Sequence, residues 1–413
     1  MTIFVPGNSD GAVCVDRIGV AKLTKMAFDG FDLRPLWHEL MAKRTDDAAG
    51  AGIGMDLSVI AQLLGDQATG LALQKEALGI QRLFRSPCAA SSPRLRVLAL
   101  AAEMDIGGNT PIEFLLEGSD IELTTLYVVP GQPWPHQLPE HDVAIVVAPD
   151  DNRTQETLSE IERHTGEWPC KILNPPQRIR QQDRDRLFRL LKSIPSLEIP
   201  ETARILRSDL TELSEATLSR QLENGRFPLI VRPLCSHAGY GLAKLGTPAE
   251  IASYLAERPE AEFFISHFVD YSSRDGLFRK YRVVCVDGWP YACHMAISAG
   301  WKIWYLNADM AVSHAKRAEE AHFMATFDDG FAMRHAGALS EMARRVGLDY
   351  FMVDCAETKA GDLLVFEADN TAIVHNMDPP GVFPYKAPQM HKVFDAFVAM
   401  LYKRAGNPRA CAA

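Results

Sequence analysis

Apolar residues recur every three or four positions in three stretches near the start of the chain, at 33–43, 55–64 and 68–84. This spacing places them on one face of a helix, so we expect three short helices. A run of small and polar residues with two prolines, at 85–94, then predicts a linker. Residues 1–90 are therefore expected to form a helical segment that packs on the rest of the chain or mediates a homodimer, in preference to a catalytic unit.

After residue 94 the pattern changes to short apolar runs separated by helical or turn segments. Runs at 95–101, 122–129 and 142–147 are rich in Leu, Val and Ile, and another begins at 172. Alternation of strands with helices predicts a small parallel sheet covered by helices, here an α/β domain over 94–178. Within this domain, Thr110 or Asn109 is expected to cap a helix whose first turn contains Pro111.

Hairpins dominate the last part of the chain. Two apolar runs flank Val286-Asp287-Gly288, and Asp-Gly is a strong signal for a two-residue turn. A second pair of runs, 350–353 and 363–366, flanks a turn at 360–362. This second hairpin is expected to bring Asp354, at the end of its first run, beside Glu367, which follows its second run.

Three carboxylates therefore converge at the second hairpin. Glu367 and Asp369 are two residues apart, so they share one face of a regular strand, and Asp354 adjoins them. Magnesium takes carboxylate oxygens together with the phosphate oxygens of a substrate. The spacing favours a site for magnesium and a nucleotide, and a surface hairpin with solvated acids is the alternative.

A loop rich in small residues follows an apolar strand that carries Arg232. The loop contains Gly239 and Gly241, and glycines let backbone N–H groups approach a phosphate closely. It is not a Walker loop, which carries a Lys-Ser/Thr pair after its second glycine, and it lacks the GxGxxG dinucleotide pattern. Cys235, inside the loop, is expected to be a small residue that fits there, in preference to a nucleophile.

In this order, the segments resemble the ATP-grasp superfamily, specifically its glutathione-synthetase-like and RimK-like carboxylate–amine ligases. The resemblance covers about residues 170–400 and extends back to about residue 94. It implies an α/β chain in which a small Rossmann-like pre-ATP-grasp domain, 94–178, precedes an ATP-grasp domain of two α+β subdomains, 179–405. It also implies that the chain binds ATP and Mg²⁺.

The resemblance assigns roles residue by residue. Phosphates are expected at Arg184, Arg232, Ser236, His237, Gly239 and Gly241, adenine and ribose at Ser266, His267, Phe268 and Asp270, and magnesium at Asp354, Glu367 and Asp369. Arg282 is expected to stabilise charge on an acyl phosphate and on the tetrahedral intermediate. His294 is expected to orient the acceptor, and a structural histidine is the equal alternative.

The chain departs from the family pattern at three kinds of position. Arg232 stands where the family has Lys, which keeps the positive charge, and Asp183-Arg184 or Asp185-Arg186 stands in place of the second phosphate-binding Lys. Asp369 replaces the Asn that usually follows the metal Glu by two residues. Residues 371–380 replace a small-residue turn that helps to bind substrate in the family. The arginines in place of lysines fit either an active or a degenerate variant. Asp369 adds a negative charge that is expected to hold metal more tightly, and the replaced turn implies a specialised substrate.

Composition narrows the class of protein. The 413 residues suggest two or three domains, and 47% hydrophobic residues is ordinary for a globular chain. A net charge of −10 without a Lys/Arg-rich tract disfavours nucleic-acid binding, and the positive charge for ATP is expected from Arg279, Lys280, Arg282 and Lys302. Eight cysteines without a CxxC pair fit reduced thiols. Because there is no apolar run of about 18 residues and no basic leader, we expect no membrane association and a cytoplasmic location.

These features together predict an ATP-dependent ligase that joins a small-molecule or peptide carboxylate to an amine through an acyl phosphate. A catalytically inactive nucleotide-binding scaffold and an ATP-dependent phosphotransferase are the alternatives. Two segments have two interpretations each. Residues 107–109 are part of an acceptor pocket or a plain turn, and the aromatic segment 301–307 is a mobile lid or, in preference, a half-buried strand.

Overall fold

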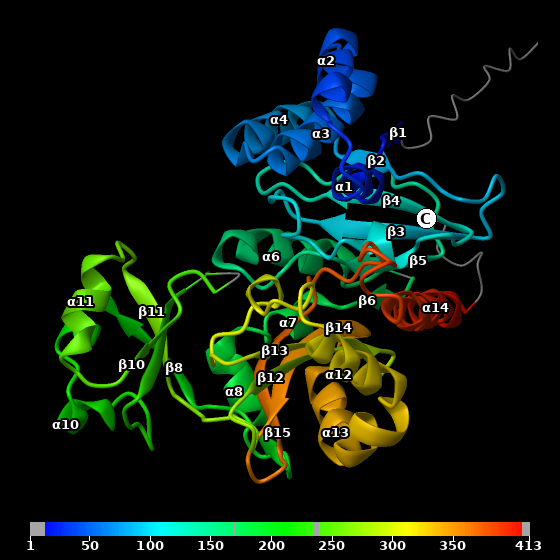
Figure 1. Ribbon diagram of the computed structural model, residues 1–413. Coiled ribbons are helices and arrows are strands. Elements are labelled where there is room, and N and C mark those ends of the chain that lie inside the picture. Colours follow the sequence, from blue (N-terminus) through cyan, green and yellow to red (C-terminus); the bar gives the residue numbers. More distant parts are fainter. Residues whose placement is uncertain (1–12, 169, 235, 237–238, 407–413) are drawn as a thin grey trace, which may run out of the picture.

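The computed structural model describes residues 13–406 apart from 169, 235, 237 and 238. Figure 1 shows three parts, each built round one sheet. The N-terminal helices (blue) lie on the first sheet (cyan), the second sheet (green) stands to one side, and the third sheet (yellow to orange) lies below. The expected α/β class is confirmed by these sheets and their covering helices. No helix in the described part of the chain has the length and apolar character needed to cross a membrane.

The first sheet has six strands in the order β1, β2, β4, β3, β5, β6. Their bounds are Val15–Asp16, Leu83–Arg85, Ile121–Tyr127, Leu95–Ala101, Val143–Val146 and Ile172–Leu173, in that order. The last four are mutually parallel, as the alternating pattern predicts. Helix α5 (Ile112–Leu115) connects β3 to β4, α6 (Gln155–Thr165) connects β5 to β6, and α7 (Pro176–Ile179) follows β6.

Four helices lie between β1 and β2, and three of them match the expected ones. They are α1 (Val20–Phe28), α2 (Arg34–Lys43), α3 (Ala48–Leu63) and α4 (Gln67–Ile80). Helix α1 was not expected. Side-chain caps start the two longest: Asp47 accepts from Gly50 N at 2.9 Å, and Asp66 accepts from Thr69 N at 3.0 Å.

The expected separation near residue 90 does not coincide with a boundary in the packing. Strand β2 pairs with β4, so residues before 90 complete the first sheet. Met55, Ala77 and Phe84 are at most 1% exposed and share one core with Leu98. Residues 86–94 do form a loop. The hydrophobic core is continuous across it, however, and a loop divides two domains only where each side has its own core.

The second sheet is antiparallel and has a core of its own. Its order is β10, β9, β11, β8, with bounds Ala243–Leu245, Leu229–Pro233, Glu262–His267 and Thr202–Leu206. Short helices cover it: α9 (Arg207–Thr211), α10 (Glu215–Leu218) and α11 (Glu250–Ala256). Leu210, Val231 and Phe263 belong to this separate core. The region 179–405 therefore contains two subdomains, as expected.

The third sheet carries both predicted hairpins. Its order is β13, β12, β14, β15, β7, with bounds Trp289–Ser298, Phe278–Val286, Tyr350–Glu357, Leu363–Asp369 and Leu197–Glu198. Asp287 and Gly288 have φ of 50° and 85°, the positive values that a tight two-residue turn requires. The surrounding helices are α8 (Arg184–Leu191), α12 (His314–Ala325), α13 (Ala336–Val346) and α14 (Lys386–Ala405).

Two local expectations are wrong. Helix α5 has no side-chain cap, because Asn109 bonds with the backbone of Ala102 and the Thr110 hydroxyl donates to the carbonyl of Asn370 at 2.7 Å. The aromatic segment 301–307 is not a strand; it is irregular and ends in a 3₁₀ turn, Tyr305–Asn307. The reason is a tertiary contact, since the Tyr305 hydroxyl bonds to buried Glu320.

Candidate active site

Four polar residues form one row across the third sheet. His294 pairs with Arg282, Arg282 with Asp354, and Asp354 with Glu367, on the adjacent strands β13, β12, β14 and β15. Directly opposed residues of antiparallel strands project from the same face. The register therefore brings together both predicted catalytic residues and two of the three predicted metal ligands.

Asp354 is the centre of the row and is held by two cations. Its carboxylate accepts from Arg282 Nε at 2.8 Å and from Arg282 Nη2 at 3.0 Å, and Lys280 Nζ lies 2.6 Å from Oδ2. Asp354 is 1% exposed, and burial by itself would raise its pKa. The charges of Arg282 and Lys280 outweigh burial and hold the pKa well below its ordinary value, so Asp354 is ionised.

Glu367 is paired with Arg184, at the start of α8. Arg184 Nη2 contacts Glu367 Oε2, and Arg184 Nη1 donates to the carbonyl of Phe366 at 2.9 Å. Burial raises the pKa of Glu367, but the charges of Arg184, Lys280 and Arg232 together outweigh burial, so the pKa lies below its ordinary value. Arg184 therefore lies where a phosphate-binding cation was expected, although its present partner is a carboxylate.

Arg232 reaches the same place from the second sheet. It is 9% exposed, its Nε donates to Ser236 Oγ at 3.0 Å, and its Nη2 donates to the Ser236 carbonyl. Burial first, and then the nearby charge of Arg184, lower the pKa of Arg232 to about 9. A lowered arginine pKa means that nearby negative charge does not fully balance the positive charge of the guanidinium. A bound anion would supply the missing negative charge.

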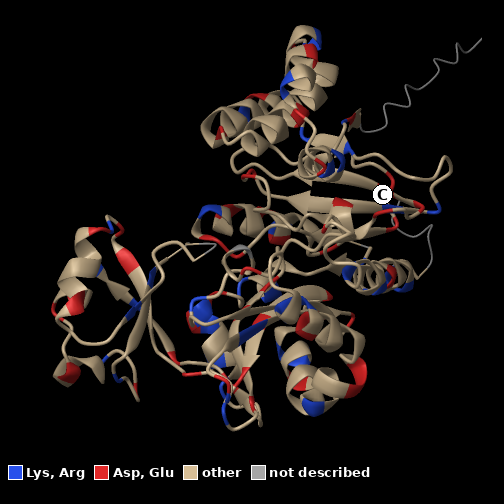
Figure 2. Ribbon diagram, in the orientation of Figure 1, with Lys and Arg blue, Asp and Glu red and all other residues tan. Residues whose placement is uncertain are grey.

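Cations exceed acids round the Asp354–Glu367 pair. Arg184, Arg232, Lys280 and Arg282 gather there, four cations against two carboxylates. Figure 2 shows basic and acidic segments interleaved where α8 lies against the third sheet. Arg279, which was also expected to supply charge here, pairs instead with Asp275 and Glu319. The remaining positive charge suits a polyanion such as a nucleoside triphosphate.

The glycine loop requires its glycines. Gly239 and Gly241 have φ of 73° and 63°, and a Cβ at Gly241 would lie 2.5 Å from Pro233 Cδ. Lys302 Nζ donates to the carbonyl of Leu242 at 2.9 Å, so the expected cation does lie beside the loop. His237 and Cys235 are outside the described residues.

The segment predicted to frame adenine runs from the end of β11 into a loop. The ammonium of Lys244 lies 4.0 Å from the centre of the Phe268 ring, and the ring centres of Phe268 and Trp301 are 5.7 Å apart. Ser266 and His267 are half-buried, and burial lowers the pKa of His267. Asp270 is exposed and bonds to Lys359 at 2.6 Å, which lowers its pKa to about 2. Asp270 thus has a surface partner, and the other three remain predictions for the nucleotide.

The predicted set of three metal ligands does not assemble in the described residues. No group of three His, Cys, Asp or Glu side chains there has the geometry to hold a metal ion. Asp369 lies two pairs further along the ladder, opposite Met352, and its Oδ1 accepts from Thr371 N and Oγ1 at 2.7 and 2.8 Å. The spacing of two residues along β15 places Asp369 on the same face as Glu367, as predicted. Its Oδ1, however, bonds to the turn that follows the strand. Asp354 and Glu367 remain as facing carboxylates.

A buried polar cluster next to His294 has no counterpart in the sequence predictions. Glu320 is 0% exposed and accepts from Tyr305 and Tyr385 hydroxyls at 3.1 and 2.6 Å, and from Met295 N. Lys386 lies 3.7 Å from Glu320 and 3.2 Å from Asp378. The Tyr305 ring lies 4.7 Å from that of His294, whose Nδ1 is buried without a partner. Burial, and then Arg282, hold the pKa of His294 well below its ordinary value, so the ring is neutral.

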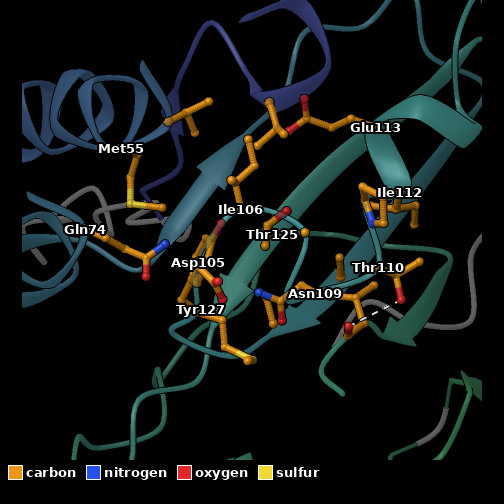
Figure 3. Close-up of a pocket in the computed structure, with 18 of the residues that line it drawn as sticks. Met55, Gln74, Asp105, Ile106, Asn109, Thr110, Ile112, Glu113, Thr125 and Tyr127 are labelled. Atoms are coloured by element: carbon orange, nitrogen blue, oxygen red, sulfur yellow. Dashed lines mark hydrogen bonds between the residues drawn. The ribbon is translucent and has the colours of Figure 1, made fainter. Parts of the chain in front are cut away.

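Gly107 and Asn109, from the predicted segment 107–109, line a small cavity of about 70 Å³ between α3, α4 and the first sheet. Figure 3 shows Met55 and Gln74 on one side of it and Thr125 and Tyr127 on the other. The predicted nucleotide and metal residues are not part of its lining. The nearest link is the bond from Thr110 to Asn370, which follows Asp369.

Comparison with known proteins gives similarity of fold only. No protein-family model matches the chain, and no curated protein matches it. It is similar to D-alanine–D-alanine ligase from Bacillus anthracis complexed with ATP, at 12% identity and a TM-score of 0.45, over 76% of this chain and 98% of that one. It is also similar to a RimK domain ATP-grasp protein from Sphaerobacter thermophilus (16%, TM-score 0.41, over 73% and 99%). A third similar structure is D-cycloserine synthetase (15%, TM-score 0.44, over 74% and 99%). These identities and TM-scores are too low to assign the chain to a family, so its function has to be argued from the site itself.

Proposed function

We propose that the chain is an ATP-grasp carboxylate–amine ligase that activates a carboxylate as an acyl phosphate and transfers the acyl group to an amine. The observation that carries the proposal is the excess of cations round Asp354 and Glu367 at the junction of the second and third sheets. Phosphoryl transfer from ATP asks a protein mainly to position the reactants and to neutralise charge. A row of cations on rigid strands supplies both.

Each residue then has a distinct role. Arg232 and Arg184 hold phosphate oxygens, and the backbone of the loop at Gly239 and Gly241 lets phosphates approach closely. Arg282 stabilises negative charge on the acyl phosphate and on the tetrahedral intermediate. Neutral His294, beside Arg282, accepts a hydrogen bond from the incoming amine and orients it.

Two facing carboxylates fit magnesium, because this ion usually takes only one or two carboxylates and completes its shell with water and phosphate. Asp354 and Glu367 would hold it, with their present cations moving to phosphate oxygens. When bound, the ion supplies charge neutralisation between the phosphates. In this proposal the chain supplies two ligands to the ion, Asp354 and Glu367, and Asp369 instead bonds to the turn after β15.

Trapping of the acyl phosphate tests the proposal. The full chain is incubated with ATP, magnesium chloride, hydroxylamine and a panel of amino acids and small carboxylic acids. A ligase converts its carboxylate to a hydroxamate and releases ADP in equal amount. Hydroxamate that also forms with Glu367→Gln would contradict the assignment. A stable phosphorylated product without hydroxamate would identify a phosphotransferase instead.

A second candidate is a nucleotide-binding protein without turnover. It is favoured by one observation, that both oxygens of Asp354 are already engaged by Arg282 and Lys280. In this case ATP binds, but neither ADP nor hydroxamate forms with any member of the panel. Nucleotide titration beside the trapping assay separates the two candidates.

A further inference from the structure

A pocket of about 350 Å³ lies between α1, the loop at 86–89 and α5, and Asn376 and Met377 close one of its sides. The geometry points to this pocket as the site that holds the apolar portion of the substrate, an acyl chain or an aromatic or aliphatic side chain of the carboxylate or the amine. This inference rests on the proposed function. It adds a substrate class to that function. The residues that would bind the apolar portion lie before residue 130 and in the segment that follows Asp369.

The lining favours apolar matter. Phe114, Leu116, Ile121 and Leu123 form its inner wall and are at most 9% exposed. Charges lie at the rim, where Lys22 and Glu117 are exposed. Pockets of a few hundred Å³ with an apolar lining and a few polar groups at the edge are typical of small-molecule sites.

Glu113, the one acid of the lining that is not exposed, is neutralised within the described chain. Glu113 accepts from Arg17 Nη2 at 2.5 Å, from Ser86 Oγ at 2.9 Å and from Ala21 N at 2.9 Å. Its charge is therefore satisfied by the protein. No ligand cation is needed to balance it, which leaves apolar contact as the main source of affinity.

A short series of contacts joins the pocket to the catalytic row. His375 precedes the two residues that close the pocket. The centre of its ring lies 6.4 Å from the ring centre of Phe114, in the lining, and 5.7 Å from that of Phe28, in α1. Asp378 follows them and lies 3.2 Å from Lys386. Lys386 stands 4.2 Å from the centre of the Tyr305 ring.

The end of this series is the reaction centre. Tyr305 contacts His294, which pairs with Arg282 in the row. The segment 375–378 therefore adjoins the pocket on one side and the cluster beside His294 and Arg282 on the other. This contact series links the pocket to the proposed reaction centre.

The test uses a matched pair of variants in the loop at 86–92. Ala89 is exposed and lines the pocket, whereas Ser91, two residues on, is exposed and does not line it. The probe is N-phenylnaphthylamine, a neutral apolar dye that fluoresces when it leaves water. The wild-type chain, Ala89→Trp and Ser91→Trp are titrated with the dye and, separately, with ATP in the presence and absence of saturating dye. Circular dichroism checks that all three are folded.

The inference expects one dye per wild-type chain, binding weakened by about tenfold or more in Ala89→Trp, and binding unchanged within about twofold in Ser91→Trp. Bound dye should change the affinity for ATP by at least about threefold, because the segment 375–378 contacts both the pocket and the Lys386–Tyr305 cluster beside the row. Absence of dye binding, equal binding by both variants, or an ATP affinity indifferent to the dye would each overturn it. Absence of ATP binding by the wild-type chain would instead refute the proposed function. The two failures are thus distinguishable.

Discussion

Arg282 and Asp354 lie directly opposite each other on β12 and β14 and are joined by two hydrogen bonds, of 2.8 and 3.0 Å. The Asp354 side chain is 1% exposed, and the Arg282 side chain is 21% exposed. A buried acid of this kind depends on its cations, since an unpaired buried charge is strongly destabilising. The same carboxylate is the best candidate to hold magnesium. Its cations therefore compete with the metal ion for one site.

Removal of Lys280 should strengthen metal binding. Lys280 Nζ lies 2.6 Å from Asp354 Oδ2, so Lys280→Ala removes one competing charge and leaves Arg282 to hold the aspartate. We expect the affinity for magnesium in the presence of ATP to rise on the order of tenfold, measured by calorimetric titration. Lys359→Ala is the matched control, because it breaks a Lys–Asp contact of equal length, to Asp270, away from the row. Unchanged or weaker metal binding in Lys280→Ala would contradict the role of Asp354.

Glu367→Gln should abolish ATP turnover and leave the fold intact. The amide keeps the size of the side chain but cannot offer a carboxylate to magnesium. The lost pair with Arg184 is partly exposed, so the cost in unfolding free energy is about 1 kcal/mol or less. Turnover and thermal melting are measured on the same samples. Glu357→Gln, on the same hairpin, is the control and should keep its turnover; full activity in Glu367→Gln would sink the metal assignment.

Arg232 should contribute directly to nucleotide affinity. Among the described residues its guanidinium bonds to Ser236 of the following loop, and its charge is under-compensated. We expect Arg232→Ala to weaken ATP binding by about 1.5–3 kcal/mol, as for a charge-assisted hydrogen bond. Arg232→Lys should recover a large part of this loss. Equal affinities of the alanine variant and the wild type in a nucleotide titration would show that the side chain points away from the phosphates.

Asp56 should make stability depend on pH between 4 and 6. It is 3% exposed and accepts from Ile18 N and Gly19 N at 2.7 and 3.1 Å, and burial raises its pKa from 3.8 to about 6. In this window the folded chain keeps a proton that the unfolded chain has released, so stability falls as pH rises. The fall attributable to Asp56 is at most about 3 kcal/mol.

Asp56→Asn should remove that fall. Denaturant unfolding at pH 4, 5, 6 and 7 gives the difference in free energy between variant and wild type, which is expected to shift in favour of the variant as pH rises. Asp66→Asn is the control, because Asp66 is an exposed helix cap. A pH-independent difference for Asp56→Asn would refute the raised pKa.

Deletion of residues 1–88 should unfold the N-terminal half of the chain. The deletion removes β2 and α3 and uncovers residues of one continuous core, among them Leu98 and Leu126, both 0% exposed. Exposed apolar surface of this kind leads to aggregation. Size-exclusion chromatography and circular dichroism measure the outcome. A monodisperse, fully folded 89–413 chain would show that the helices are a removable cap.

Much of the catalytic row could be predicted from local pattern. The Asp-Gly turn at Asp287 fixes the hairpin of β12 and β13, and the short turn before β15 fixes the register of Asp354 and Glu367. Two-residue periodicity in strands then places alternate residues on one face. These are short-range rules, which is why they apply without knowledge of the rest of the fold.

Partners distant in sequence could not be predicted in the same way. Arg184 meets Glu367 across 183 residues, and Tyr385 meets Glu320 across 65. No turn or period links such residues; packing of helices α8, α12 and α14 on the sheet brings them together. The bonds of Asp369 to Thr371 are a different case: they span two residues, and this local Asp turn was not predicted although its range is short.

The sequence by itself determined the local elements, the two hairpins, the positions of the glycines and the residue types capable of binding a nucleotide. Tertiary structure alone decided that residues before 90 complete the first sheet, that four cations surround Asp354 and Glu367, and that Lys280 and Arg282 occupy the aspartate. The physical reason is the range of the forces. Hydrogen-bond geometry and turn conformation act over a few residues and leave a mark in the sequence, whereas burial and charge pairing depend on which surfaces meet after the chain has folded.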